Sequence, residues 1–211
     1  MPEIIIPGPE GRLEARYHKA DDPRAPICLV LHPHPRQGGT MNNKLVYNTY
    51  QAFKKSNFST LRFNFRGVGK SLGTYDSGVG ELTDAAAALD WLQSENPAAK
   101  TTWIAGFSFG AWLSLQLLMR RPEISGFVAI SPPASLYDFS FLAPCPASGL
   151  IIQGTEDNIV KEEAVSELVV KLNKQKSITI DYKKINGADH FFKKNLEDIQ
   201  KKILKYIDKN I

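Results

Sequence analysis

A serine between glycines at residues 106–110 is the strongest chemical signal in the sequence. Gly-Phe-Ser-Phe-Gly fits the pattern G-x-S-x-G, which is typical of a sharp strand-to-helix turn that exposes a nucleophilic serine. Residues 101–105 are rich in β-branched and aromatic types, and residues 111–118 form an apolar run suited to a helix. The five residues alone would also fit a glycine-rich turn with an incidental serine, but this context favours Ser108 as a nucleophile.

A serine hydroxyl is a weak nucleophile near neutral pH, so Ser108 needs a base and an acid that orients the base. On folds that carry this motif, the acid follows the serine along the chain and the histidine follows the acid. Residues 154–157, Gly-Thr-Glu-Asp, form a turn after an apolar run. We predict Asp157 as the acid, with Glu156 as the alternative.

The base is predicted to be His190, which lies in a loop after the strand-like residues 178–183 and before the last helical pattern. Asp189 is disfavoured as the acid because a residue adjacent to a histidine in the sequence seldom reaches its ring nitrogen. All three predicted groups follow strand-like runs, so a parallel sheet would bring them to one edge.

The loop after the apolar residues 27–31 is expected to bind the oxyanion that forms during acyl transfer. It reads His-Pro-His-Pro-Arg at 32–36, and its two prolines have no N–H to donate. The predicted donors are therefore the backbone amides of His34 and of Phe109, the residue after the nucleophile. Arg36 is the weaker candidate.

Two other functions are disfavoured by the same segments. His32 and His34 lack a third ligand nearby, so no metal site is expected. Gly-Lys-Ser at 69–71 resembles the end of a phosphate-binding loop, but the position of its first glycine holds Asn64. A turn after a strand explains this segment better.

Strand-like and helix-like patterns alternate along the chain. The strand-like runs are residues 13–18, 27–32, 59–65, 101–106, 126–131, 149–153 and 178–183. Apolar stripes at helical spacing cover residues 82–92, 160–172 and the segment that begins at 196. The alternation predicts an α/β fold with a mostly parallel central sheet and helices on both faces. Without repeats or linkers, residues 1–211 are expected to form one domain.

The composition is that of an ordinary globular protein, with 211 residues, of which 43% are hydrophobic and 23% charged. No apolar run approaches the roughly 18 residues of a spanning helix. The first residues lack a basic region, and Pro7 and Pro9 interrupt their apolar stretch, so a cytoplasmic protein is expected. Cys28 and Cys145 are isolated and predict neither a disulfide nor a metal site.

The net charge of +4 is dispersed, apart from lysines that alternate with apolar residues near the carboxyl end. That spacing is typical of a solvated helix face rather than of a nucleic-acid surface. We therefore expect neither a nucleic-acid nor a membrane partner. The protein is expected to be a monomer or a homodimer.

These residues together resemble the α/β-hydrolase superfamily, in particular its small lidless members similar to dienelactone hydrolases and related predicted bacterial serine hydrolases. The resemblance covers nearly the whole chain and is carried by segments 32–44, 64–71, 106–110, 154–157 and 187–192. It implies Ser108, Asp157 and His190 as nucleophile, acid and base. Dienelactone hydrolases proper use a cysteine nucleophile, so their lactone chemistry is not implied.

Larger members of the superfamily insert a cap domain before the strand that carries the acid. Here only residues 132–146 intervene, so an open site without a cap is expected. Its edge is predicted to consist of aromatic side chains, each of which would also fit the core: Trp112, Tyr137, Phe139, Phe141 and Phe191.

The expected function is hydrolysis of small, short-acyl carboxylic esters by a serine hydrolase that needs no cofactor. The same residues would also serve a thioesterase or a peptidase, because the chemistry of an acyl-enzyme does not depend on the leaving group. A binding module without catalysis is the alternative from another class, but such modules usually lose a member of the triad.

Overall fold

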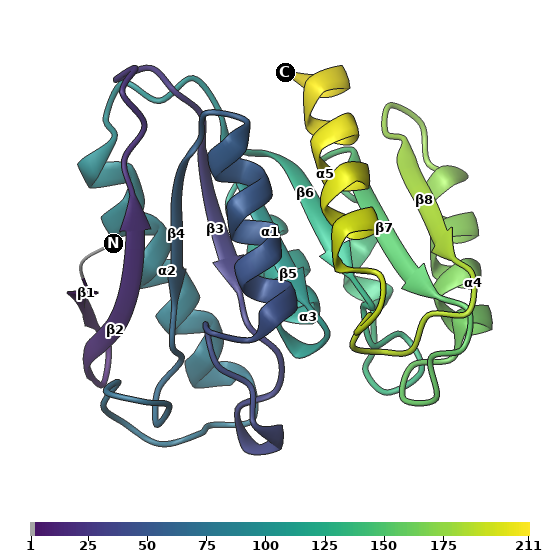
Figure 1. Ribbon diagram of the computed structural model, residues 1–211, viewed down its shortest axis with the longest axis horizontal. Coiled ribbons are helices and arrows are strands. Elements are labelled where there is room, and N and C mark those ends of the chain that lie inside the picture. The colour runs from purple at the N-terminus through teal and green to yellow at the C-terminus, as the bar shows by residue number, and fades with distance from the viewer. Residues whose placement is uncertain (1–2) are drawn as a thin grey trace.

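The computed structural model describes residues 3–211 as a central sheet between two layers of helices (Figure 1). The strands of the sheet are β1 (Glu3–Gly8), β2 (Gly11–His18), β3 (Ile27–Leu31), β4 (Ser59–Phe63), β5 (Thr102–Phe107), β6 (Ile124–Ile130), β7 (Gly149–Gly154) and β8 (Ile180–Ile185). Their order across the sheet is β1-β2-β4-β3-β5-β6-β7-β8. Strands β3 to β8 are parallel and β2 is antiparallel to both neighbours, which confirms the mostly parallel sheet.

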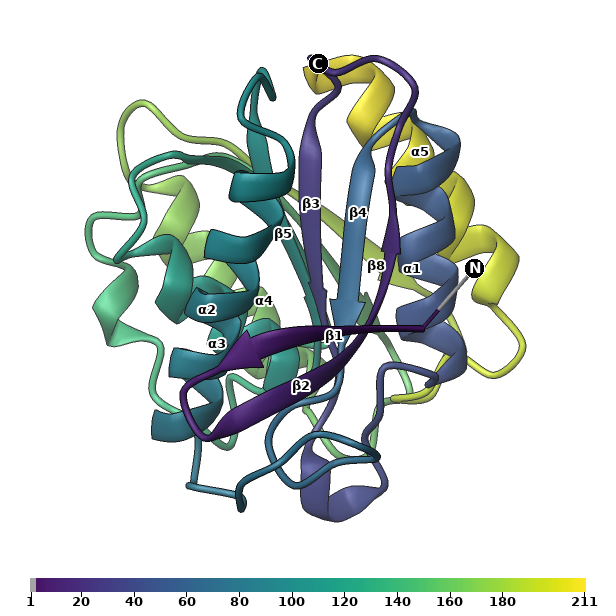
Figure 2. The same cartoon turned by 90° about the vertical axis from the view of Figure 1, so that its left-hand side faces the viewer.

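Helices cover both faces of the sheet, as the alternating pattern predicts (Figure 2). The helices are α1 (Lys44–Lys55), α2 (Val79–Glu95), α3 (Phe109–Leu118), α4 (Glu162–Asn173) and α5 (Leu196–Asn210). Helices α2, α3 and α4 pack on one face, and α1 and α5 pack on the other. In residues 3–211, no helix combines the length and apolar character that would let it cross a bilayer.

The central strands are apolar throughout because each face of the sheet is covered by helices. In β3, Ile27, Leu29 and Leu31 belong to the core under α2, α3 and α4. The alternate residues Cys28 and Val30 belong to the core under α1 and α5. Such a strand buries both of its faces, and its carboxyl end reaches the edge of the sheet where the predicted site residues lie.

Two elements were not singled out by the sequence patterns. Strand β1 forms a hairpin with β2 at the edge of the sheet, where Pro7 is tolerated because an edge strand does not need every N–H. Helix α1 begins at an Asn43 cap, whose side chain accepts hydrogen bonds from the amides of Leu45 and Val46. The predicted strand boundaries otherwise differ from the observed ones by a few residues.

The connection from β6 to β7 contains a single turn of 3-10 helix, Ser140–Leu142, and no domain. The predicted absence of a cap is therefore confirmed. The segment is tied to α3 by the Trp112 indole, which donates a hydrogen bond to the carbonyl of Asp138 at 3.3 Å.

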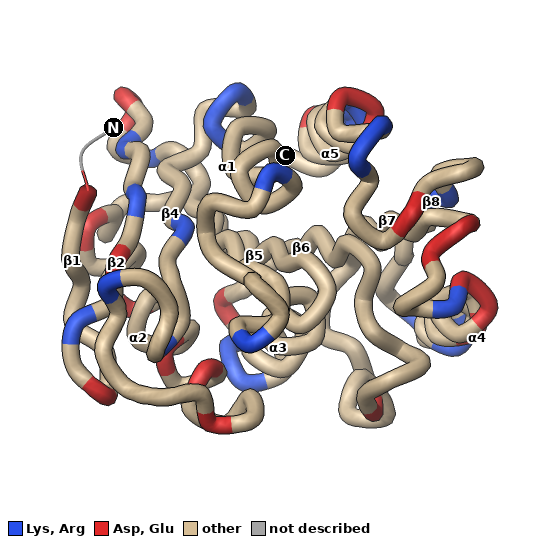
Figure 3. Tube along the Cα trace, turned by 60° about the horizontal axis from the view of Figure 1, so that its bottom comes forward, with Lys and Arg blue, Asp and Glu red and all other residues tan. Residues whose placement is uncertain are grey.

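Helix α5 packs on α1 through an apolar side and presents its lysines on the other. Ile199, Ile203 and Ile207 are buried, whereas Lys201 and Lys205 are exposed. Gln200 bridges the two helices, since its amide oxygen accepts a 2.7 Å hydrogen bond from Lys55. In the view of Figure 3, basic and acidic segments intermingle along the helices and do not form one basic face.

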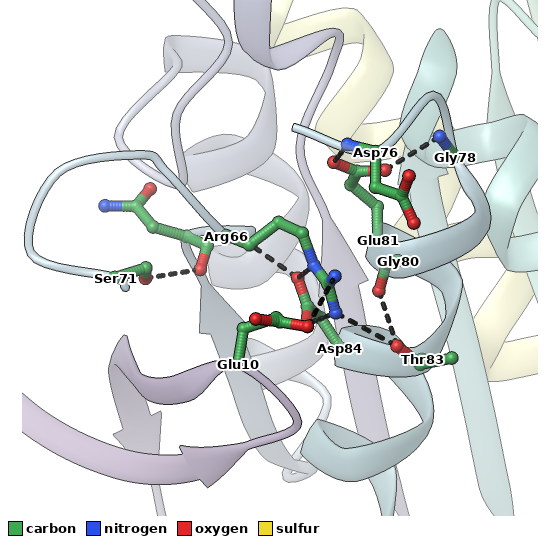
Figure 4. A network of polar contacts seen from close by, with 10 residues as sticks. Glu10, Arg66, Ser71, Asp76, Gly78, Gly80, Glu81, Thr83 and Asp84 are labelled. Carbon is green, nitrogen blue, oxygen red and sulfur yellow. Dashed lines mark hydrogen bonds and ion pairs between the residues drawn. The ribbon is translucent and has the colours of Figure 1, made fainter. Parts of the chain in front are cut away.

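A buried ion pair anchors the segment that follows β4 to helix α2 (Figure 4). Arg66 Nη2 donates to Asp84 Oδ1 at 2.8 Å, and both the Nε and the backbone amide of Arg66 donate to Asp84 Oδ2, at 3.0 and 2.9 Å. Asp84 is 0% exposed and Arg66 is 5% exposed. The Arg66 guanidinium also donates to Thr83 Oγ1 at 3.1 Å, but Asp84 is the buried carboxylate that balances its charge.

Replacement of Asp84 by alanine is expected to lower the free energy of unfolding by about 3–5 kcal/mol, because it removes the buried carboxylate that pairs with the Arg66 guanidinium. The matched control is Glu10→Ala, which removes a mostly exposed carboxylate 3.8 Å from the same guanidinium. That change should cost about 1 kcal/mol or less. Urea unfolding of the three proteins measures both effects, and equal losses would contradict the role assigned to Asp84.

Candidate active site

The turn between β5 and α3 has the backbone geometry of a nucleophile elbow. Ser108 sits at φ 54 and ψ −118, a conformation that L-residues rarely adopt. A Cβ on Gly106 would overlap the carbonyl of Gly110, and a Cβ on Gly110 would lie 2.5 Å from the carbonyl oxygen of Leu31. Both glycines are therefore required for the close approach of backbone that lifts Ser108 above the sheet.

The structure brings Ser108, His190 and Asp157 into one chain of hydrogen bonds. Ser108 Oγ lies 3.0 Å from His190 Nε2, and His190 Nδ1 lies 2.7 Å from Asp157 Oδ2. The three residues follow β5, β8 and β7, whose parallel carboxyl ends meet at one edge of the sheet. His190 and Asp157 are buried and Ser108 is half-buried, so the serine is the most accessible of the three.

Asp157 is held as a carboxylate by several donors. Its Oδ1 accepts from the amides of Ile159 and Val160 at 2.9 and 2.8 Å, and its Oδ2 also accepts from Gln153 at 3.0 Å. Burial alone would raise the pKa of Asp157, but the hydrogen bonds from His190 and from the two amides outweigh it and lower the pKa. An ionised Asp157 keeps the proton on His190 Nδ1 and leaves Nε2 free to accept the proton of Ser108.

The two alternative acids do not contact the imidazole ring. Glu156 is exposed, and its backbone amide donates to the carbonyl of Ala188 at 3.0 Å. Asp189 points back along its own loop, where Oδ1 accepts from the amide of Lys193 at 3.4 Å. Of the three acidic side chains, Asp157 is the one that the structure joins to the ring of His190 by a hydrogen bond.

The loop after β3 lies directly beside the elbow. The ring of His34 is 5.0 Å from the ring of Phe109, measured between centroids. The carbonyl of His34 accepts from the amides of Gln37 and Gly39 at 3.0 and 3.1 Å, which curls the loop into a short turn. The two residues predicted as oxyanion donors are therefore neighbours in space, although they are far apart in the sequence.

The predicted aromatic edge is only partly assembled. Trp112 stacks on Tyr137 at 4.4 Å and lies 5.7 Å from Phe109. Phe191 lies 5.2 Å from the ring of His190 and is 43% exposed. Trp112 and Tyr137 therefore lie beside Phe109 of the elbow, and Phe191 lies beside His190.

Phe139 and Phe141 stack on each other at 5.8 Å, and Phe139 is buried in the core. Phe139 also lines a groove of about 530 Å³ between the β6–β7 connection and α4, which Tyr137 borders as well. No residue of the triad lines this groove. Phe139 and Phe141 are the two predicted aromatic residues for which the structure shows no ring contact with Phe109 or His190.

Two residues of the site were missed by sequence reasoning. Gln153 donates to Asp157, and its signal was a lone amide within an apolar strand. Tyr75 places its hydroxyl 3.0 Å from His34 Nε2, and its loop offers no pattern that predicts this. Among residues 3–211, no group of three or more His, Cys, Asp or Glu side chains is placed to hold a metal ion.

His32 joins the ends of β3 and β4 from a fully buried position. Its Nδ1 donates to the carbonyl of Pro33 at 2.7 Å, and its Nε2 accepts from the amide of Phe65 at 3.1 Å. Burial lowers the pKa of His32 from 6.5 to about 4, against the opposing effect of the Pro33 carbonyl. His32 is therefore a structural neutral imidazole under the loop that carries His34.

This lowered pKa makes stability depend on pH. Between about pH 6.5 and pH 4 the unfolded chain binds a proton at His32 that the folded chain does not, so stability is full above pH 6.5 and falls as the pH drops towards 4. The contribution of His32 to this fall is about 3 kcal/mol.

His32→Gln, whose amide can donate and accept, should reduce the loss of unfolding free energy between pH 7 and pH 4.5. Urea titrations at both pH values measure it. His18 is half-buried and burial also lowers its pKa, so His18→Gln serves as a comparison that should remove a smaller part of the loss. An unchanged pH dependence in His32→Gln would contradict the assignment.

The chain is similar in sequence and in fold to known proteins. A family model described as X-Pro dipeptidyl-peptidase (S15 family) matches residues 9–143. The chain is 58% identical to the uncharacterized protein RP471 of Rickettsia prowazekii (strain Madrid E), over 98% of this chain and 89% of that protein.

Solved structures of other proteins share this fold. The structure is similar to ATU1826 of Agrobacterium tumefaciens, a protein of unknown function described as an α/β hydrolase, with a TM-score of 0.96, 54% identity, and coverage of 98% and 95% of the two chains. It is also similar to XC6422 of Xanthomonas campestris, an α/β serine hydrolase without a lid, with a TM-score of 0.88, 32% identity, and coverage of 99% and 94%.

The fold, the elbow and these relatives define the class of protein as a serine hydrolase. The chain belongs to the α/β-hydrolase superfamily, as a member without a lid that matches the S15 family model. The name of the S15 family describes an activity on peptides, and the bond that this chain cleaves is a separate question.

Proposed function

We propose that this hydrolase is a carboxylesterase that cleaves small esters with short acyl groups through an acyl-enzyme on Ser108. The observation that carries the proposal is the chain of hydrogen bonds of 3.0 and 2.7 Å from Ser108 through His190 to Asp157. It places a base within reach of the hydroxyl proton and an ionised acid behind the base.

The geometry supports the following reaction. Ser108 Oγ attacks the acyl carbon while its proton passes to His190 Nε2, and Asp157 stabilises the imidazolium. The backbone amides of His34 and Phe109 donate to the oxyanion of the tetrahedral intermediate. Collapse breaks the bond to the alcohol, which leaves with the proton from His190. Water then attacks the acyl-enzyme by the same steps and releases the acid.

A peptidase is the second candidate, because the S15 family model matches residues 9–143. Hydrolysis of an X-Pro p-nitroanilide would use the same three residues. The two candidates separate in one assay, in which the purified protein is given p-nitrophenyl acetate and an X-Pro p-nitroanilide side by side. A kcat/KM that is higher for the ester supports the carboxylesterase, and the reverse order supports the peptidase.

Ser108→Ala is expected to abolish labelling by a fluorophosphonate and to lower ester turnover by several orders of magnitude, because only positioning and the oxyanion donors remain. Asp157→Asn should lower kcat by about four orders of magnitude through a misplaced imidazole proton. Glu156→Gln is the matched control and should change turnover little, since Glu156 does not contact the ring. Kinetics and circular dichroism of each variant measure activity and folding.

Wild-type turnover by a folded Ser108→Ala protein would reject the nucleophile. If Glu156→Gln lowered kcat strongly and Asp157→Asn did not, Glu156 would be the acid. A wild-type protein that is folded but not labelled by the fluorophosphonate would favour a binding module.

The dependence of kcat/KM on acyl-chain length is an independent test of how open the site is. Without a cap, little of a long chain is removed from water, whereas each fully buried methylene would add about 0.8 kcal/mol. We expect kcat/KM for p-nitrophenyl esters to level off within about two to six carbons on this per-methylene basis. A rate that keeps rising to dodecanoyl would show that residues 132–146 form a real acyl pocket.

A further inference from the structure

Tyr75 and His34 are joined by a hydrogen bond that involves no residue of the triad. Tyr75 is half-buried in the connection between β4 and α2, and its hydroxyl oxygen lies 3.0 Å from His34 Nε2. The rings of the two residues are 5.1 Å apart, and the ring of Tyr75 is also 6.3 Å from that of Phe109. The contact therefore lies beside both predicted oxyanion donors.

The direction of this hydrogen bond follows from the other nitrogen of the ring. His34 Nδ1 accepts from the backbone amide of Arg36 at 3.2 Å, so the proton of the neutral ring is on Nε2. Burial lowers the pKa of His34, which keeps the ring neutral near pH 7. Nε2–H thus donates to the Tyr75 oxygen, and both ring nitrogens are engaged.

The loop that carries Tyr75 is anchored to the core of the protein. Glu81, which is 0% exposed, accepts from the amides of Asp76 and Gly78 at 2.9 and 2.7 Å (Figure 4). Gly78 has φ +95, and a Cβ there would lie 2.6 Å from the ring of Trp112. The loop that carries Tyr75 is consequently fixed by a buried carboxylate on α2 and by close packing on α3.

The Tyr75 ring also contacts the loop after β3 through Arg36. The guanidinium carbon of Arg36 lies 4.6 Å from the centroid of the Tyr75 ring, which is a cation–π contact. Tyr75 is thus packed by the same loop whose histidine it binds. A hydroxyl held this firmly is suited to fix its partner's ring.

We infer that Tyr75 is a positioning residue, which acts through its hydrogen bond to His34 Nε2 to hold the His34 backbone amide towards the oxyanion of the tetrahedral intermediate. The inference rests on the proposed function. The contribution of an oxyanion donor depends on a fixed geometry, because the donor has to be in place before charge develops. A loop of only a few residues after β3 obtains that fixed geometry from Tyr75.

Tyr75→Phe tests the inference, because it keeps the ring and removes only the hydroxyl. The expected result is a fall of about tenfold in kcat, less than the 10²–10³-fold loss of a whole oxyanion donor. The KM for p-nitrophenyl acetate and the urea midpoint should stay unchanged. A trifluoromethyl ketone forms a tetrahedral adduct with the serine, so its inhibition constant should rise by the same factor as kcat/KM falls.

Tyr17→Phe is the matched control. Tyr17 is also half-buried and its hydroxyl is also hydrogen-bonded, to Asn96 at 3.0 Å, but it lies on β2 away from the site. This variant should keep the kcat and the ketone affinity of the wild type.

A double-mutant cycle separates direct action from action through His34. His34→Ala keeps the backbone amide and removes the ring. If Tyr75 acts through that ring, Tyr75→Phe should have no further effect on kcat in the His34→Ala background. Full additivity would overturn the inference.

The remaining outcomes of these experiments also decide whether the inference stands. A Tyr75→Phe protein that resembles Tyr17→Phe, or one whose kcat falls while ketone affinity does not, overturns the inference but leaves the esterase proposal intact. A folded wild-type protein that neither hydrolyses esters nor binds the ketone overturns the proposed function and this inference with it.

Discussion

The close contact of backbone with backbone at the elbow is the constraint on which the site depends. Helix α3 can begin against the ends of β3 and β5 only because Gly106 and Gly110 carry no Cβ. That approach forces Ser108 into its unusual backbone conformation and brings the loop after β3 beside Phe109. The nucleophile and the proposed oxyanion donors are thus positioned by one steric requirement. Steric exclusion of this kind is rigid, since no rotamer change can relieve it.

Buried carboxylates that accept backbone amides recur around this centre. Asp157 binds two amides of the turn after β7, Glu81 binds two amides of the loop before α2, and Asp84 binds the amide of Arg66. Each carboxylate orders an irregular segment at the carboxyl edge of the sheet, where no strand or helix could satisfy those amides. A protein without a cap has few other ways to make such loops rigid. Two of these carboxylates, Glu81 and Asp84, are placed on helix α2, and the third, Asp157, lies in the turn that it orders.

The sequence was sufficient where local pattern or topology decides the outcome. The placement of Ser108 beside His190 follows from a motif and from the position of a loop after a parallel strand, and the mostly parallel sheet follows from the alternation of patterns. The choice of Asp157 over its neighbour depends on which way a turn points its side chains, and contacts with amides of the same turn decide that in three dimensions. Tyr75 could not be found, because its partner is 41 residues away and its loop has no periodicity. Phe139 was assigned to the edge of the site but is buried, since residue type alone does not separate core from cleft.

The packing of α5 on α1 has a consequence for protein synthesis. The hydrogen bond between Lys55 and Gln200 joins residues 145 positions apart, and His190 lies in the loop just before α5. Ribosomes make the elbow and the loop after β3 well before they make His190. Phe192, in the loop of His190, is buried in the core that α1 and α5 enclose, so part of the packing of this loop waits until α5 has docked. A nascent chain that already contains Ser108 therefore lacks the histidine that we propose as its base. Long-range docking in this protein therefore completes the proposed site late in translation, well after the serine has been made.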